Sequence, residues 1–137
     1  MELLVSSLIL LVVIVSLLIS YIRCLELAEL SKNILSATNA SRSRMEQIKN
    51  TEFDQIAANH NNVTFTSPNF NGMGVSYVTT VNPDFLQVTV TFCWRQTSGR
   101  VIGEDKNLNG LVNAGEDMNG NGILDSTVQL VNYIYRI

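Results

Sequence analysis

An uninterrupted apolar run stands near the start of the chain. Residues 3–22, LLVSSLILLVVIVSLLISYI, contain no charged residue, no glycine and no proline. About 20 helical residues at 1.5 Å each cross a hydrocarbon layer of roughly 30 Å. The run therefore predicts a helix that can reside in a membrane. A cleaved signal peptide would need a basic start, a shorter apolar core and a small-residue cleavage site, and the run has none of these.

The same helix is predicted to continue beyond Arg23. Apolar residues recur there at steps of three and four, which places them on one helical stripe. The stripe consists of Leu27, Leu30, Ile34, Ala37, Met45 and Ile48. The first proline is Pro68 and the first glycine is Gly72, so nothing forces a break before about residue 57. We expect one helix roughly 75–80 Å long at 1.5 Å per residue.

The chain divides into three predicted segments. Residues 1–23 form a hydrophobic helix suited to a membrane or a filament core. Residues 24–58 continue this helix with an amphipathic face that should pack on another element, and residues 59–137 form a globular domain. A membrane anchor followed by a simple stalk is the alternative for the first two segments.

The last segment predicts a small antiparallel sheet of three or four strands. A turn-rich loop is expected over 61–74, followed by strands at 75–81, 85–95 and 127–137, and FLQVTVTFCWR (85–95) shows the clearest alternation. Leu86, Val88, Val90, Phe92 and Trp94 share its apolar face, and the amphipathic half of the helix is the only long candidate to cover them. The predicted fold is α+β, with the first half of the helix protruding and the sheet packed on the second half.

An acidic, glycine-rich loop at 103–126 has the spacing of a calcium-binding loop. It follows the pattern D-x-[DN]-x-[DN]-G-x5-E, in which hard oxygen ligands alternate, a glycine makes the sharp turn and a last carboxylate closes the shell. The predicted ligands are Asp105, Asn107, Asn109, the backbone carbonyl of Leu111, Asn113 and Glu116.

A second, overlapping copy begins at once. It comprises Asp117, Asn119, Asn121 and Asp125, with Gly122 at the turn, and Val128 stands where the terminal acid would be. We expect a weaker site, or oxygens lent to the first one, so one or two calcium ions would order the loop. The alternative is a solvated cluster of Asn-Gly turns without metal.

Composition argues against several functions. The net charge is −3 and the basic residues are scattered, so no nucleic-acid partner is inferred. The only histidine, His60, lies in a stretch that predicts a solvated polar loop, and paired acids occur only within the metal-like loop. The sequence does not predict an enzyme.

The two cysteines, Cys24 and Cys93, allow at most one internal disulfide. Cys24 follows the apolar run, and Cys93 lies on the strand face directed away from the predicted helix cover. An internal bridge, a bond between subunits and free thiols are the three alternatives.

The amino-terminal stretch MELLVSSLILLVVIVSLLISYI resembles that of type IV pilins and type II secretion pseudopilins. In this family a glutamate followed by Leu-Leu-Val opens the mature hydrophobic helix. The layout is similar over the whole chain, whereas the specific motif covers only residues 2–22. SRSRMEQIKNTEFDQI, the strand VTVTFCWR and the acidic GEDxNxNG loop are similar to the smaller, minor-pilin-like members.

The resemblance implies a subunit of a helical filament. Its partners would be copies of itself, the inner membrane before assembly, and the pilus or secretion assembly machinery. The filament would be extracellular at the cell surface, or a periplasmic pseudopilus. In the family the glutamate, here Glu2, pairs with the terminal amine of a neighbouring subunit. A residue that merely reaches the headgroups is the alternative role for Glu2.

The resemblance has two departures. Family members usually carry a short leader ending in glycine, which a prepilin peptidase removes, and a few residues before the glutamate, and this sequence shows neither. Either the leader and first mature residues lie outside the given chain or the start is unusual, so leader removal and methylation are not carried over. Many relatives also have a glycine or proline in the apolar helix, and this chain has neither. The functional alternative to a filament subunit is a membrane-tethered, extracytoplasmic calcium-binding module that does not polymerise.

Overall fold

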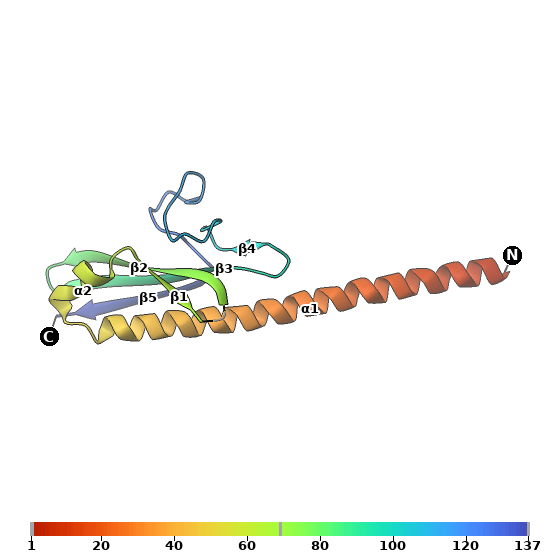
Figure 1. The fold of residues 1–137 in the computed structure, drawn as a ribbon, viewed down its shortest axis with the longest axis horizontal. Coiled ribbons are helices and arrows are strands. Elements are labelled where there is room, and N and C mark those ends of the chain that lie inside the picture. Colours follow the sequence, from red (N-terminus) through yellow and green to blue (C-terminus); the bar gives the residue numbers. More distant parts are fainter. Residues whose placement is uncertain (1, 69, 137) are drawn as a thin grey trace. The chain divides into compact units, whose positions relative to one another are not determined.

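The computed structural model describes residues 2–68 and 70–136 (Figure 1). Its elements in chain order are α1 (Glu2–Lys49), α2 (Phe53–His60), β1 (Val63–Ser67), β2 (Phe70–Asn82), β3 (Phe85–Arg95), β4 (Val101–Ile102) and β5 (Val128–Tyr135). The chain forms two compact units, Met1–Lys32 and Asn33–Ile137, and the boundary between them falls within α1. The predicted α+β class, a long amino-terminal helix with an antiparallel sheet packed on it, is confirmed.

Helix α1 ends earlier than the sequence analysis predicted. Its last residue is Lys49, so the expected continuation through residues 24–58 is wrong beyond that point. The Thr51 hydroxyl donates to the Gln47 carbonyl at 3.1 Å and the Thr51 amide to the Ile48 carbonyl at 3.1 Å. Such local bonds offer the backbone an alternative to a further helical turn. The break permits α2 to turn inward, where Ile56 is 1% exposed.

Helix α2 is fixed to the sheet by polar contacts that the sequence did not reveal. The Ser76 hydroxyl donates to the His60 carbonyl at 2.7 Å, and the Val78 amide donates to Asn61 Oδ1 at 3.0 Å. His60 Nε2 lies 2.9 Å from the Thr51 hydroxyl. Burial, and next the charge of Arg44, lower the pKa of His60. The expectation of a solvated histidine in a loop is therefore wrong.

The sheet has five antiparallel strands built around β3. Strand β2 pairs with one side of β3, and Val78 lies opposite Val88. Strand β5 pairs with the other side over Phe85–Phe92, and β4 pairs with the end of β3 at Trp94 and Arg95. Strand β1 extends the sheet beyond β2. The predicted strands at 75–81, 85–95 and 127–137 all exist, and the last of them is observed as Val128–Tyr135; Ile137 lies outside the described residues.

The loop expected over 61–74 is largely strand. It contains β1 and the start of β2, although Gly72 and Gly74 predicted a breaker. In register, Gly74 lies between Phe65 of β1 and Phe92 of β3. A Cβ at Gly74 would collide with the Phe65 ring, so glycine here makes room for an aromatic neighbour rather than ending the strand. The Phe65 and Phe92 rings lie 5.6 Å apart between centroids.

The hydrophobic core lies between the last turns of α1 and one face of the sheet. Its buried cluster consists of Met45, Ile48, Ile56, Val78, Leu86, Val88 and Val90, with Phe53, Phe65, Leu130 and Ile134 packed against it. Ala37, Met45 and Ile48 are buried as the predicted stripe requires, whereas Leu27 and Ile34 are exposed. In Figure 1 the end of α1 lies along one side of the sheet and the β4–β5 loop lies on the other.

Replacement of Ile48 by alanine should strongly destabilise the domain. Ile48 is fully buried in the α1–sheet core, and loss of such a side chain costs about 2–5 kcal/mol. Urea unfolding of the full chain in detergent, followed by Trp94 fluorescence, measures this cost. Leu35→Ala is the matched control, because Leu35 on the same helix is 62% exposed. Equal midpoints for the two variants would contradict the assigned helix face.

Candidate functional sites: the apolar helix and the acidic loop

The apolar part of α1 is exposed along its length in the described part of the chain. Its large apolar residues from Leu3 to Ile22 are 46–86% exposed. The helix contains an 18-residue window of mean hydropathy 3.0, none of it buried, so its length and composition suffice to cross a membrane. Ser6 and Ser16 donate to the carbonyls one turn back, at 2.9 and 2.8 Å, which satisfies their hydroxyls within the helix. An apolar amino-terminal helix of this kind serves as a membrane anchor or a secretion signal.

Glu2 occupies the first turn of α1 and is exposed. The amide groups at a helix start favour a negative charge there. Over residues 2–68 and 70–136 its carboxylate has no ion-pair or hydrogen-bond partner.

The first predicted metal loop is closed by its own side chains. The Asp105 carboxylate, fully buried, accepts from the Asn109 amide at 3.1 Å and the Gly110 amide at 2.7 Å. Asn107 Oδ1 accepts from the Asn109 amide, and Asn109 Oδ1 accepts from the Leu111 amide. The side chains predicted as metal ligands at positions one, three and five thus accept from backbone amides and define consecutive turns.

The second copy repeats this arrangement twelve positions later. Asp117 accepts from the Asn121 amide at 3.1 Å and the Gly122 amide at 2.8 Å, Asn119 Oδ1 accepts from the Asn121 amide, and Asn121 Oδ1 accepts from the Ile123 amide. Gly110 and Gly122 both have positive φ, 73° and 78°. In each copy the residue two positions before this glycine also has a positive φ: Leu108 (φ 58°) in the first copy and Gly120 (φ 71°) in the second. The sequence repeat is therefore also a structural one.

Three of the predicted ligand oxygens converge on one side-chain nitrogen. Asn113 Nδ2 lies 3.2 Å from Asn109 Oδ1, 3.0 Å from the Leu111 carbonyl and 2.9 Å from Glu116 Oε2. An amide nitrogen carries only two hydrogens, so three acceptors exceed what it can fully satisfy. In the second copy the roles are reversed, and Asp125 Oδ2 accepts from Asn119 at 2.6 Å and Asn121 at 2.8 Å.

Glu116 is held as a carboxylate. Burial opposes its ionisation, but donors from the Asn113 side chain and from the backbone amides of Asn113, Lys106 and Asn107 together lower its pKa. The Lys106 amide lies 3.0 Å from Oε1, and the Asn113 amide lies 3.1 Å from Oε2. A buried negative charge is thereby available beside the convergent oxygens.

The donor set is rich in amides and poor in carboxylates. Among residues 2–68 and 70–136, no group of three His, Cys, Asp or Glu side chains gathers as a metal site. Any cation in this loop would depend on Asn oxygens and the Leu111 carbonyl in addition to Asp105 and Glu116. Oxygen donors of this kind fit a hard cation such as Ca²⁺ and do not fit a thiolate- or imidazole-seeking metal.

The loop covers the second face of the sheet. Leu124 is fully buried with Val75 and Tyr77, and its amide donates to the Tyr77 hydroxyl at 3.0 Å. Gly110 faces Thr64 of β1 so closely that a Cβ would collide with the threonine methyl. The polar face of β3, opposite the helix, is therefore partly buried, and Thr91 is 1% exposed.

Both cysteines are free in this structure. Cys24 is exposed on α1, whereas Cys93 is buried under the loop. The Cys93 thiol lies 3.8 Å from the Asp125 carbonyl, and Gly103 is so close that a Cβ there would collide with the Cys93 sulfur. Burial raises the pKa of Cys93 and keeps it a neutral thiol. Strand alternation correctly placed Cys93 away from the helix but gave no sign of the loop above it.

Comparison with known protein families, curated proteins and solved structures finds no match to the chain. The architecture itself is pilin-like: a long apolar amino-terminal helix precedes an antiparallel sheet that packs on the last turns of that helix.

Alanine at Gly110 should destabilise the domain more than alanine at Gly122. Both replacements force a side chain into the left-handed region, at about 1–2 kcal/mol. Only Gly110 adds a clash with Thr64, because nothing lies within 4 Å of a Cβ at Gly122. The crowding should add about 1–3 kcal/mol. Chemical denaturation of the full-length variants measures the difference, and an equal loss for both would show that the loop does not dock on β1.

Proposed function

We propose that the protein is a structural, non-enzymatic subunit of a type IV pilus-like filament. The observation that carries this proposal is helix α1, which begins at Glu2. Its first half is apolar and exposed, and its last turns pack on the antiparallel sheet. A contiguous apolar surface of this size on a monomer marks a partner or a membrane. Lipid would cover the helix before assembly, and the helices of neighbouring copies would cover it in an extracellular or periplasmic filament.

Glu2 supplies the register of this assembly. A carboxylate buried among packed apolar helices is costly, and the cost is relieved only when an opposite charge arrives. The terminal amine of a neighbouring copy would provide that charge. Helix packing that leaves Glu2 unpaired would be disfavoured, whereas packing that pairs it would be selected.

Replacement of Glu2 by glutamine should reduce filament yield sharply. Loss of one member of a buried charge pair costs about 3–5 kcal/mol, which corresponds to association weakened by more than roughly a hundredfold. Negative-stain images and the yield of sedimentable fibres from cells measure the effect. Glu52→Gln is the matched control, because Glu52 is an exposed acid that makes no capping bond through its side chain.

Wild-type yield from the Glu2→Gln variant would refute the register role of this residue. Wild-type protein that stays with membranes and forms no fibre would favour the alternative, a tethered extracytoplasmic module that does not polymerise.

Calcium binding in the 103–126 loop forms the second part of the proposal. Support comes from the repeated ligand spacing, the buried Asp105 and Glu116 carboxylates and the oxygens of Asn109 and Leu111 that face one point. An ion there would satisfy acceptors that now compete for two amide hydrogens, once the Asn113 side chain turns its oxygen inward. The ion would tie together a segment that contains little regular structure.

Calcium should raise the unfolding temperature of the full chain, and a chelator should reverse the rise. Free ion at a hundred times the dissociation constant would stabilise the fold by about 2.7 kcal/mol. Glu116→Gln should abolish most of the shift, whereas Asp117→Asn should leave the first site intact. Magnesium at the same concentration is the control cation, because it binds less readily than calcium to a site of this kind. No calcium-dependent shift in the wild-type chain would refute the proposal.

A further inference from the structure

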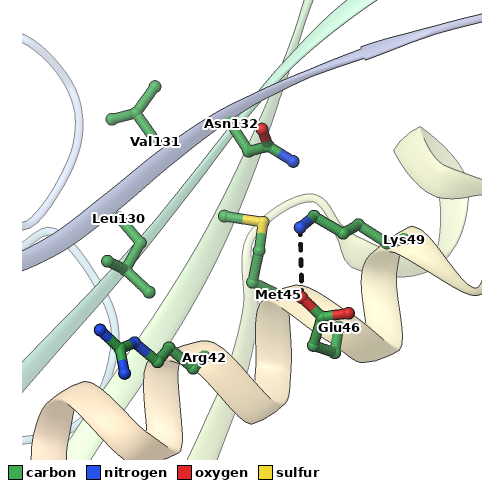
Figure 2. Close-up of a pocket in the computed structure, with 7 residues that line it drawn as sticks. All are labelled: Arg42, Met45, Glu46, Lys49, Leu130, Val131 and Asn132. Carbon is green, nitrogen blue, oxygen red and sulfur yellow. Dashed lines mark hydrogen bonds and ion pairs between the residues drawn. The ribbon is translucent and has the colours of Figure 1, made fainter.

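A groove of about 220 Å³ lies between α1 and β5 (Figure 2). It is lined by Arg42, Met45, Glu46, Lys49, Leu130, Val131 and Asn132. Met45 and Leu130 belong to the hydrophobic core and form an apolar floor. A cavity of about 150 Å³ accommodates a molecule the size of benzene, so this groove has room for one large side chain.

The rim of the groove is cationic. Lys49 pairs with Glu46 at 3.1 Å, whereas Arg42 is exposed and has no ion-pair partner within residues 2–68 and 70–136. Residues 33–49 carry Arg42, Arg44 and Lys49 against Glu46 alone, which is a net charge of +2. An occupant that presents an apolar side chain surrounded by acidic residues would match the apolar floor and the cationic rim of the groove.

The acidic loop of the same chain has these two properties. Residues 103–126 contain five acids and one lysine, a net charge of −4 without metal, and one bound Ca²⁺ would leave the loop at −2. Met118 stands at its surface with 81% of its area exposed. The Met118 amide donates to Glu104 Oε1 at 3.2 Å, so its backbone is held while its side chain projects. A large apolar side chain presented within an acidic surface suits an apolar floor with a basic rim.

The loop and the groove lie on opposite faces of the sheet within one compact unit. The loop covers Val75 and Tyr77, whereas the groove adjoins the α1 side. A contact between two different surfaces of identical chains is heterologous, and its repetition generates an open helical polymer or a ring. Loop-to-groove contact therefore suits growth of a filament.

We propose that the groove between α1 and β5 receives Met118 and the surrounding acidic loop of a second copy of this chain. This inference rests on the proposed filament function and identifies one contact between its subunits. The Met118 side chain contacts Met45 and Leu130 of the neighbour, and Arg42 and Lys49 face the negative loop. Salt weakens the contact, because exposed charges are screened beyond about 8 Å at physiological ionic strength.

Cysteine cross-linking between two tagged copies of the full chain tests the contact. Both carry Cys24→Ser, one carries Met118→Cys and the other carries Asn132→Cys in the groove. Mild oxidation of membranes or fibres that contain both should give a mixed disulfide dimer at least tenfold above the control. The control replaces Met118→Cys by Ser98→Cys, which lies on the exposed turn after β3. Equal yields from the two pairs would overturn the inference.

A charge exchange tests the same contact without a cross-link. Met118→Lys and Arg42→Glu should each reduce fibre yield severalfold, and the two together should restore it. Both positions are exposed, so neither change should disturb folding. Absence of rescue in the double variant would count against the contact.

Fibre images separate this inference from the proposed function. Normal fibres without the mixed dimer would refute the loop-to-groove contact and leave the filament function standing. A mixed dimer in membranes without fibres would support the contact and refute the filament.

Discussion

The domain depends on a central strand that is buried on both faces. Strand β3 places Leu86, Val88 and Val90 in the core with α1 and α2, and Phe92 against Phe65 and Phe70. Thr89, Thr91 and Cys93 lie on its other face and are buried too. It pairs with β2 along one side and with β5 and β4 along the other. Loss of either cover would expose a strand whose residues have little contact with water, so helix, sheet and loop stabilise one another through β3.

The main elements of the fold and their buried faces could be predicted from the pattern of apolar residues alone. The apolar run, the stripe at Ala37, Met45 and Ile48, and the alternation of β3 each identify an element and its inward face. The end of α1 at Lys49 could not be placed, because Asn50–Glu52 contain no proline or glycine and tertiary packing of Ile56 decides the turn. Gly72 and Gly74 misled in the opposite direction, since their lack of a side chain serves the neighbouring aromatic rings.

The acidic loop shows what ligand spacing can and cannot predict. The spacing of Asp105, Asn107 and Asn109 predicted calcium ligands, and that stays a prediction. In the structure these side chains accept from backbone amides two to five residues on, as the alternative of Asn-Gly turns describes. It could not reveal that Leu124 anchors the loop over Tyr77, since that contact joins residues far apart in the chain. The cover over Thr91 and Cys93 follows from this anchor and explains why these residues on the polar face of β3 are buried.

The labelling rate of the buried Cys93 thiol reports local opening of the acidic loop. A thiol reagent can reach it only when the segment around Gly103 and Ser126 lifts from β3, and burial also suppresses the reactive thiolate. Cys24, exposed on α1, reacts without any such opening and supplies an internal reference in the same molecule. The ratio of the two labelling rates would give the free energy of lifting the loop, separate from that of unfolding the whole domain.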